Sequence, residues 1–411
     1  MLFQSAPTIP SRIVRWRNGL GLILLATLGP AFLVGASSVQ IDANFPGGNI
    51  VVERIEGDTV FLHQDLRETA GDWFYWCFRV RGAAGRTLQF QFTKSPVIGA
   101  RGPAHSRDGG RTWQWLGTNI VTGQSFTHHF PADATEDFFS LAMPYTERNW
   151  RIFLARVGAS PALAVETLCQ SPHGRDVELA RLGQIHRPPA HRVALTARHH
   201  ACEMMMNYAL EGIIEAVLAE DETGRWLREH VEFLIVPFMD KDGVEEGLQG
   251  KNRLPHDPNR DYQGMPHYPS VKALKQRLPA WSERKLRFAL DLHCPYIRGA
   301  GSERIHFVGS PYPVQWARAR RLCDLLARGQ TGPLPYYPED NIPYGKSWNT
   351  VAEPKMFGRW AAGLPGVDFA TTIELPYATV RGVEVNAATA RAFGHDLARA
   401  MREYLRTRPT R

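Results

Sequence analysis

Hydrophobic and polar positions follow two different patterns along this chain. Between residues 39 and 155 the hydrophobic runs are short, rich in aromatic residues and partly alternating, at 51–55, 59–62, 73–80, 87–92, 111–115 and 125–130. Turn-forming triplets such as Glu56-Gly57-Asp58 separate them. Short strands with regular turn signals are typical of a β-sandwich. We expect the aromatic rings to fill its core, with a ligand-stacking face as the alternative.

From about residue 160 onward, short hydrophobic runs alternate with longer helical patterns. The pattern predicts strands at 193–196, 232–237, 286–292, 305–308 and 369–373, and helices at 202–218, 224–230, 271–278, 313–328 and 387–405. Runs without alternation, such as 233–236, indicate strands buried on both faces. We therefore predict an α/β domain over residues 156–411, with a mixed central sheet flanked by helices, after an all-β sandwich domain over residues 39–155.

The first 38 residues have another character. Arg12, Arg15 and Arg17 precede an apolar run over residues 20–34, and small residues follow it. This is the pattern of a secretory signal peptide. The run is short for a membrane span, although a signal-anchor and a later start codon are alternatives. We expect an exported protein, periplasmic or extracellular, which is membrane-tethered if the segment is uncleaved and cytoplasmic if the segment is not real.

Composition narrows the function only slightly. The chain has 411 residues, of which 44% are hydrophobic and 22% charged, as in an ordinary folded protein with a sizeable core. The net charge is +7, but no run of Lys and Arg with interleaved aromatics predicts a nucleic-acid partner. The five cysteines are too widely spaced for a disulfide scaffold, and we expect mostly buried free thiols.

Side chains with metal-binding chemistry follow the predicted strands. His200 and Glu203 come after the first strand, three residues apart at a helix start, where they share a face. His293 ends the third strand. Ligands of such sheets gather outside the carboxyl ends of the strands, so these three side chains can meet. Two histidines and a glutamate are a ligand set of hydrolytic zinc, and we predict one Zn²⁺ per chain.

Neighbouring residues leave alternatives open. His199 and Cys202 have the same spacing as the first ligand pair, and Cys294 adjoins His293. A single histidine is more often buried for packing than used as a ligand. The joint occurrence of the pair, a strand-terminal histidine and a strand-terminal glutamate favours the metal site.

The strand-terminal glutamate is Glu374, after the predicted strand 369–373. A carboxylate at this place is costly to bury unless it is paired or used. Beside a metal-activated water it can accept a proton and return it to the leaving group. The alternative is a salt bridge at the rim of the sheet.

A polar loop over residues 250–262 offers groups that could bind substrate. Asn259 and Arg260 are suited to clamp a terminal carboxylate, because arginine presents a planar fork of donors. Arg253 could stabilise developing oxyanion charge. The alternative is a loop held by internal ion pairs, such as Arg253 with Asp257.

Taken in order, these motifs resemble the M14 zinc carboxypeptidases. The resemblance rests on His200-Ala201-Cys202-Glu203, Asp242-Gly243-Val244, Asn259-Arg260, His293 and Thr372-Ile373-Glu374. Segments 73–75, 99–102, 113–117 and 142–146 resemble the front domain of the cytosolic carboxypeptidase branch, in which a β-sandwich precedes the catalytic domain. The resemblance covers nearly everything after the N-terminal segment. One departure is Ala201-Cys202, where many members of the branch have Pro-Gly.

The resemblance implies a role for each motif residue. His200, Glu203 and His293 would bind zinc; Glu374 would be the general base and proton donor; Asn259 and Arg260 would bind the C-terminal carboxylate; and Arg253 would polarise the scissile carbonyl. Tyr344, Tyr336 and Tyr337 are candidates for the tyrosine with which the family closes over substrate. Lys355 and Arg359 precede the Glu374 strand, where the family builds its side-chain pocket. They would favour a C-terminal Glu or Asp, unless they are solvated surface charges.

We therefore predict a zinc metallocarboxypeptidase that hydrolyses the C-terminal residue of peptides or proteins, with acidic residues as candidate substrates. Peptide or protein C-termini are the expected partners. One alternative is a zinc amidase or deacylase acting on cell-wall peptides or acylated amino acids. The other is a catalytically silent binding protein. A requirement for a free α-carboxylate would distinguish a carboxypeptidase from the amidase or deacylase. Cleavage of any peptide would distinguish it from the catalytically silent binding protein.

Overall fold

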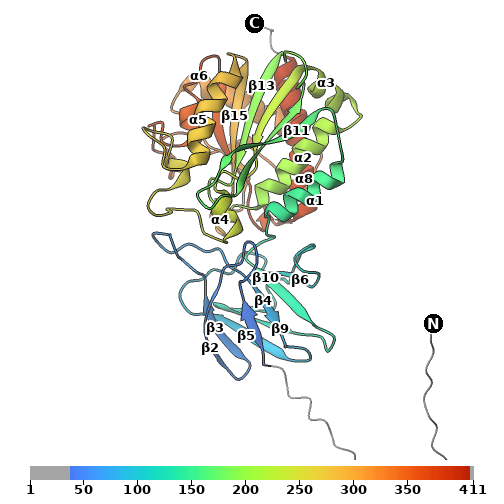
Figure 1. Ribbon diagram of the computed structural model, residues 1–411, viewed down its shortest axis with the longest axis vertical. Helices are drawn as coiled ribbons and strands as arrows, with labels where there is room; N and C mark the ends of the chain where they lie inside the picture. Colours follow the sequence, from blue (N-terminus) through green and yellow to red (C-terminus); the bar gives the residue numbers. More distant parts are fainter. Residues whose placement is uncertain (1–37, 408–411) are drawn as a thin grey trace, which may run out of the picture. The chain divides into compact units, whose positions relative to one another are not determined.

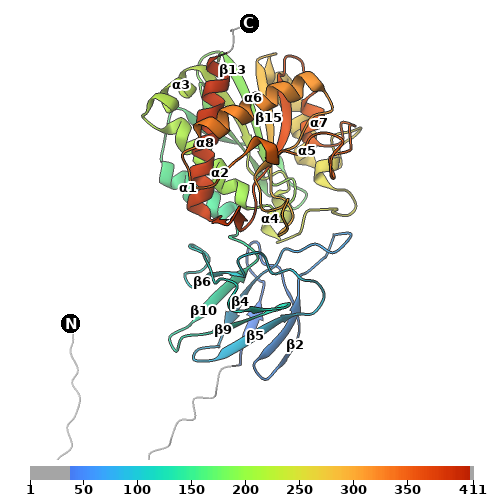
Figure 2. The same ribbon diagram turned by 180° about the vertical axis from the view of Figure 1, so that it is seen from behind.

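The computed structural model describes residues 38–407, and the chain from Ser38 onward forms one compact unit. The predicted signal or signal-anchor segment, residues 1–38, lies outside the described residues except for Ser38. Among the described residues, no helix is both long and apolar enough to cross a membrane. Figures 1 and 2 show the strand-rich front half and the helix-flanked sheet that follows it.

The front half contains two five-stranded sheets, which confirms the predicted β domain. One has the order β1 (Gln40–Asp42), β4 (Cys77–Arg81), β10 (Glu136–Ser140), β6 (Ala104–Ser106) and β7 (Gln114–Trp115). The other has the order β2 (Val51–Glu56), β3 (Thr59–His63), β5 (Thr87–Phe92), β9 (Ser125–His129) and β8 (Val121–Thr122). Neighbouring strands are antiparallel except for β3 and β5.

Aromatic rings join the two sheets, as predicted for the core of a sandwich. Phe90 of β5 lies 5.3 Å from Phe78 of β4 and 5.4 Å from Phe139 of β10, between ring centroids. The prediction of a strand over residues 73–80 was wrong in its first half, because β4 begins at Cys77. The preceding aromatics pack elsewhere: the Phe74 ring lies 5.6 Å from the Tyr377 ring of the second half. A hydrophobic run at an interface has the same sequence pattern as a buried strand.

The second half is built on a seven-stranded mixed sheet. Its order is β11 (Leu163–Gln170), β12 (Asp176–Gly183), β14 (Val231–Val236), β13 (His191–Ala197), β15 (Leu286–His293), β17 (Phe369–Glu374) and β16 (His306–Phe307). The four central strands are parallel. The five predicted strands are present, and the antiparallel edge hairpin β11–β12 was not predicted. Most side chains of β11 are solvent-exposed, so its sequence carries no buried-strand signal.

Helices cover both faces of this sheet. One face carries α2 (Met205–Leu218), α6 (Pro313–Gly329) and α8 (Ala387–Arg406), which lie toward the viewer in Figure 2, and the other carries α5 (Pro269–Ser282) and α7 (Phe357–Ala361). Alternating residues of β13 supply the two cores: Val193 and Leu195 pack on the first side, and Ala194 on the second. Packing of α2 on α8 requires Gly212, because a Cβ there would lie 2.0 Å from the carbonyl oxygen of Arg391.

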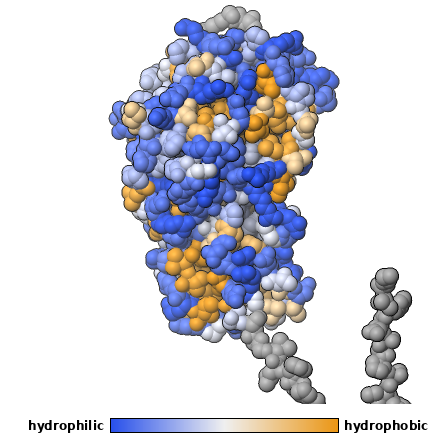
Figure 3. Space-filling model, viewed as in Figure 1, coloured by the Kyte–Doolittle hydropathy of each residue, from blue (hydrophilic) through white to orange (hydrophobic). Residues whose placement is uncertain are grey.

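The remaining elements are short or peripheral. They are α1 (Glu147–Val157), α3 (Glu222–His230), α4 (Lys241–Glu245), β18 (Thr379–Val380), β19 (Val383–Glu384) and 3-10 turns at Pro258–Arg260 and Pro338–Asp340. The domain boundary predicted at residue 155 falls inside α1, whose Arg156 pairs with Glu215 of α2 at 2.8 Å. Figure 3 shows a mostly hydrophilic face on which hydrophobic residues gather in patches, one of them on the strand-rich half.

Candidate active site

Three side chains meet where the central strands of the mixed sheet end. His200 and Glu203 lie in the turn between β13 and α2, and His293 is the last residue of β15. His200 Nδ1 lies 3.1 Å from Glu203 Oε1, and His293 Nδ1 lies 2.5 Å from Glu203 Oε2. All three residues are buried, and one ligand atom from each falls within 4.8 Å of the others. The predicted ligand set is therefore brought together.

The turn that carries the first two side chains is fixed by its neighbours. Arg198 has a φ of 61°, and its buried guanidinium donates to the carbonyl oxygens of Ala201 and Tyr145 at 2.9 and 2.7 Å. Gly250 lies against the same turn, where a Cβ would come 2.1 Å from the Ala201 nitrogen. Both contacts hold the backbone of the turn, so the position of the side chains does not depend on a Pro-Gly pair.

A carboxylate stands behind each histidine. His200 Nε2 lies 3.3 Å from Asp257 Oδ1, and His293 Nε2 lies 2.7 Å from Asp291 Oδ2. Such partners fix the tautomer and leave Nδ1 free to bind a metal, as in most metal-ligating histidines. Burial alone would raise the pKa of Asp291, but the imidazoles of His199 and His293 hold it well below its usual range. Asp291 is therefore ionised.

The charges of this cluster fit a bound cation. Burial alone would raise the pKa of Glu203, but the Lys251 ammonium and the imidazoles of His293 and His200 hold it well below its usual range. Lys251 Nζ contacts Glu203 Oε1 from a loop. A buried carboxylate requires such a counter-charge. Two imidazole nitrogens with one carboxylate oxygen are a ligand set of zinc, so the residues present fit that ion.

A cavity of about 420 Å³ opens on this cluster. Glu374, the last residue of β17, lines it; in the sheet it stands beside His293 in register. Glu374 is 7% exposed, and its buried Oε2 has no hydrogen-bond partner among the described residues. Burial raises the pKa of this carboxyl. An ionisable oxygen without a partner beside a ligand cluster has the properties of a general base.

Asn259 and Arg260 lie in the 3-10 turn and also line the cavity. The Asp257 side chain caps the turn by accepting from the Asn259 N–H at 2.8 Å. Asn259 is buried: its Nδ2 lies 3.1 Å from His293 Nε2, and its Oδ1 accepts from the Phe357 N–H at 3.1 Å. Arg260 is exposed, and Nη1 donates to the Asn259 carbonyl oxygen at 2.9 Å. Both predicted substrate-binding residues therefore stand at the ligand cluster.

The chain is similar in sequence to known zinc carboxypeptidases. Residues 153–276 match the zinc carboxypeptidase family. The chain carries an M14 zinc carboxypeptidase domain. It is 25% identical over 351 residues to an uncharacterized protein of Zymomonas mobilis, covering 83% of this chain and 88% of that protein. It is 25% identical over 202 residues to Cytosolic carboxypeptidase 2 of Mus musculus, covering 45% of this chain but only 23% of that protein.

Solved structures share the fold of both halves. The metallo-carboxypeptidase from Burkholderia cenocepacia has a TM-score of 0.76 at 21% identity and covers 90% of this chain and 99% of its own. The metallo-carboxypeptidase from Pseudomonas aeruginosa, solved in complex with (2-guanidinoethylmercapto)succinic acid, has a TM-score of 0.72 at 20% identity and covers 89% of this chain. Because this coverage exceeds the mixed sheet, the zinc carboxypeptidase domain and its front sheets belong to one shared architecture.

The neighbouring residues weighed as alternative ligands have other partners. His199 Nδ1 lies 2.7 Å from Asp291 Oδ1, and its Nε2 lies 2.7 Å from the Tyr262 hydroxyl. Cys202 Sγ lies 3.7 Å from the Tyr377 hydroxyl, and burial raises its pKa to about 12. Cys294 is buried at the cavity wall, and burial raises its pKa as well. These side chains surround the cluster of His200, Glu203 and His293 and are not part of it.

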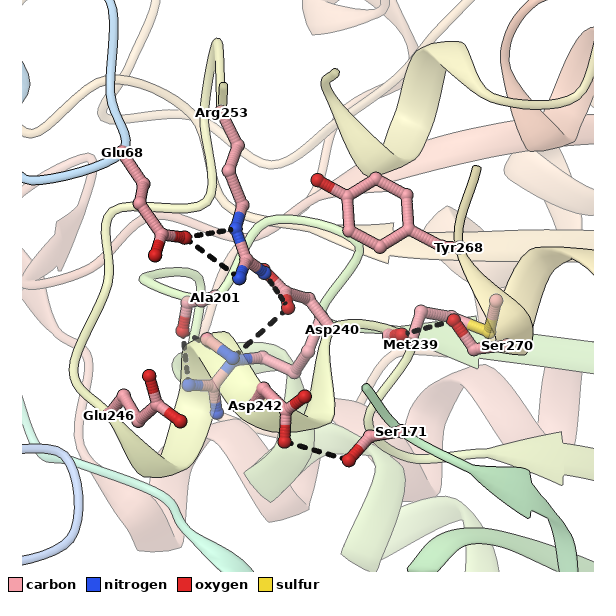
Figure 4. A network of polar contacts seen from close by, with 12 residues as sticks. Glu68, Ser171, Ala201, Met239, Asp240, Asp242, Glu246, Arg253, Tyr268 and Ser270 are labelled. Atoms are coloured by element: carbon pink, nitrogen blue, oxygen red, sulfur yellow. Dashed lines mark hydrogen bonds and ion pairs between the residues drawn. The ribbon is translucent and has the colours of Figure 1, made fainter. Parts of the chain in front are cut away.

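Arg253 does not join this site. Its Nε and Nη2 donate to Glu68 Oε2 at 3.1 and 3.0 Å, and its Nη1 contacts Asp240 (Figure 4). The guanidinium is not among the groups that line the cavity. Lys251, two residues earlier, does line it, and its Nζ lies 5.2 Å above the Trp73 ring. No sequence signal distinguishes these two cations, because both belong to one polar loop.

The two residues predicted to shape the side-chain pocket, Lys355 and Arg359, also lie away from the cavity. Neither Lys355 nor Arg359 is among the residues that line the cavity. Arg359 is buried, and its Nη2 donates to the Gly309 carbonyl oxygen at 3.0 Å and to Asn349 Oδ1 at 2.7 Å. It holds a loop instead of facing substrate.

The predicted capping tyrosines do not reach the cavity either. Tyr344 donates to the Thr350 carbonyl oxygen at 3.2 Å, Tyr336 is buried, and the Tyr337 ring lies beneath Arg381. The cavity is instead lined by other groups that the sequence analysis did not single out: Trp73, Lys251, Tyr296, His306 and Trp348. Tyr296 and Trp348 are half exposed, as expected of aromatic residues at an opening.

Proposed function

We propose that this chain is a zinc-dependent carboxypeptidase that hydrolyses the C-terminal residue of peptides or proteins. The observation that carries the proposal is the meeting, in one cavity, of the His200, Glu203 and His293 cluster with an unpartnered Glu374 oxygen and the Asn259-Arg260 pair. His200, Glu203 and His293 would hold the zinc ion, which supplies Lewis-acid activation of water and of the scissile carbonyl when it is bound.

Glu374 acts as the base in this proposal. Its free Oε2 accepts a proton from the attacking water and returns it to the amine that leaves. The raised pKa of the carboxyl supports both halves of this transfer, because a stronger base accepts the proton more readily and still donates it to an amine. No other protein donor competes for Oε2 among the described residues.

Asn259 and Arg260 select the end of the chain. The buried Asn259 amide is held through its Oδ1, which accepts from the Phe357 N–H, so its Nδ2 presents a fixed donor. The exposed Arg260 guanidinium uses only Nη1, on the Asn259 carbonyl oxygen, and its other donors can receive a carboxylate. A peptide with a blocked C-terminus would leave these donors unpaired in the cavity, which lowers the binding energy. This requirement separates a carboxypeptidase from an amidase or deacylase on the same scaffold.

A cation is also needed near the scissile carbonyl. Arg253, which the family resemblance assigns to this role, would first have to leave Asp240 and Glu68. Lys251 already lines the cavity, where its ammonium pairs with Glu203. Glu203 would bind zinc instead, and we propose that the ammonium then stabilises the developing oxyanion. The alternative role for Lys251 is to attract an acidic C-terminal side chain, which would retain the predicted acidic preference without Lys355 or Arg359.

Lys251→Met separates these two roles. Equal loss of kcat/KM on Glu-ended and Leu-ended peptides assigns Lys251 to the oxyanion. Selective loss on Glu-ended peptides assigns it to the side chain and supports an acidic preference. No loss on either substrate overturns both roles. Lys355→Met is the matched control, because Lys355 does not line the cavity and should leave both rates unchanged.

Glu374→Gln tests the proposed function directly. Metal content and cleavage are measured side by side for the wild type and this variant, on one peptide with a free and an amidated C-terminus. We expect equal zinc in both proteins, and cleavage only by the wild type and only of the free end. Cleavage of the amidated peptide would favour the amidase alternative. Zinc in both proteins without any cleavage would favour a catalytically silent binder.

The N-terminal segment sets where the enzyme works. We propose that residues 1–38 direct export, on the strength of the basic and apolar pattern before residue 38. N-terminal sequencing of the protein recovered from its native cell tests this. A mature chain that begins near residue 38 supports export, and an intact segment on a membrane-associated protein supports a signal-anchor.

A further inference from the structure

A second cluster of metal-binding side chains lies between the two sheets of the front half. His105 of β6 and Asp137 of β10 come from one sheet, and His128 of β9 comes from the other. His105 Nε2 lies 2.6 Å from Asp137 Oδ1, and His128 Nε2 lies 3.9 Å from the same oxygen. Two imidazoles thus converge on one carboxylate at a place where the sheets face each other.

Three polar atoms of this cluster have no protein hydrogen-bond partner within residues 38–407. Among the described residues, His105 Nδ1, His128 Nε2 and Asp137 Oδ2 are buried without a hydrogen-bond partner. Asp137 is fully buried and His105 is 3% exposed. The surroundings are aromatic: the Phe139 ring lies 5.0 Å from both imidazoles. An unpartnered polar atom in such surroundings costs free energy, and an ion beside Asp137 Oδ1 would supply a partner for His128 Nε2.

We propose that His105, His128 and Asp137 bind a divalent transition metal of the zinc class, separate from the active site. Two imidazoles and a carboxylate are a ligand set of that class. Ligand atoms on a tetrahedral zinc with bonds of about 2.0–2.1 Å are about 3.3 Å apart. The observed separations are 2.6 Å for His105 and 3.9 Å for His128. An ion would therefore move His105 and Asp137 apart by about 0.7 Å and draw His128 in by about 0.6 Å.

The nearby cation does not block this site. Arg107 Nε lies 3.8 Å from Asp137 Oδ1, but its side chain is 43% exposed, and its Nη2 pairs with Asp133 at 3.1 Å. It can keep that surface partner when an ion binds. The cluster of His173, Asp242 and Glu246 differs, because Arg175 already neutralises its carboxylates at 2.5 and 2.8 Å. That cluster needs no metal.

An ion at this place would tie the two sheets together. Ligands from β6 and β10 hold it on one side, and the ligand from β9 holds it on the other. Because it would bind the folded state only, the ion would raise the melting temperature without touching the catalytic cavity. The role we infer is structural, which makes its test independent of any peptidase assay.

The test measures cobalt binding by the full chain. His200→Ala removes a ligand of the active site. We expect this protein, stripped with chelator and reloaded, to hold one Co²⁺ per chain with a visible absorption band of four-coordinate cobalt. Adding His128→Gln should abolish the band and the bound ion, whereas adding His129→Gln should change neither. His129 is the matched control because its Nδ1 lies 3.0 Å from the Thr87 hydroxyl, away from the cluster.

The outcomes decide the proposal in either direction. Equal cobalt content in His200→Ala with and without His128→Gln would overturn it, as would the absence of bound cobalt in His200→Ala. Melting temperatures of the metal-free proteins report whether His128→Gln perturbs the fold itself. If it does, His105→Gln replaces it, and loss of the band in that variant assigns the cobalt to this cluster.

Discussion

Arg253 is predicted to stabilise the fold rather than the transition state, and Arg253→Met tests this. Its guanidinium lies between Asp240 and Glu68, which belong to different halves of the chain (Figure 4). Asp240 is fully buried as a side chain and caps α4 by accepting from the Gly243 N–H at 3.0 Å. Burial raises the pKa of Asp240, and the charge of Arg253 opposes that rise. Removing the cation leaves a buried carboxylate uncompensated.

The magnitude follows from the burial of the two partners. Breaking a buried ion pair from one side costs about 3–5 kcal/mol. The contact with Glu68 adds less than about 1 kcal/mol, because that side chain is 46% exposed. Asp240→Asn in the Arg253→Met background removes the stranded charge. We therefore expect the double variant to recover much of the lost free energy of unfolding, as coupled neighbours do.

Urea unfolding followed by tryptophan fluorescence measures these differences, and kcat on a Leu-ended peptide is recorded for the same samples. We expect Arg253→Met to lower the unfolding midpoint and to keep most of the activity of its folded fraction. An unchanged midpoint together with a large loss of kcat would refute the reasoning, since it would mean that Arg253 leaves Asp240 to act on substrate. Lys275→Met, at a half-buried lysine bonded to the backbone oxygens of Tyr262 and Gly264, controls for loss of one positive charge.

Three further predictions follow from single contacts. Asp291→Asn should weaken zinc binding about 10- to 100-fold in a chelator competition, because it removes the carboxylate behind His293. Asp108 accepts from the backbone and hydroxyl of Thr112; burial opposes ionisation, but these bonds lower its pKa to about 2. The ionised Asp108 carboxylate should therefore stabilise the fold by about 1 kcal/mol above pH 4, a small contribution because the side chain is only half-buried. This contribution should be lost between about pH 4 and 2, so the free energy of unfolding of Asp108→Asn should fall less over that range in acid unfolding. Arg359→Met should lower the melting temperature and slow cleavage of Glu-ended and Leu-ended peptides alike, because this side chain holds a loop; selective loss on Glu-ended peptides would contradict that.

The sequence predicted the parts of this structure that have a local signal. The central strands and long helices follow from hydrophobic period, and the ligand cluster follows from strand ends, since His200, His293 and Glu374 lie where parallel strands finish. The direction of a side chain within a loop has no such signal. Lys251 and Arg253 are two residues apart, yet one lines the cavity and the other points to Glu68, which only the three-dimensional structure brings near.

Long-range contacts explain the other differences. The aromatic run at 73–76 fits a strand in isolation, but it packs against the second half of the chain. Arg359 was expected to face substrate because it precedes the Glu374 strand, whereas Asn349 and a backbone oxygen bind it from a loop. In both cases the residue type was informative, and the partner was too distant in sequence to predict.

The amide of Gln249 has a consequence for how the chain unfolds. Its Oε1 accepts from the Tyr75 N–H at 2.7 Å and its Nε2 donates to the Tyr75 carbonyl oxygen at 2.8 Å, so one side chain serves Tyr75 as a neighbouring strand would. Separating the halves would strand both groups and open the cavity wall at Trp73. The two halves should therefore melt in one cooperative transition, and a fragment limited to residues 156–411 should lose its fold and its activity together.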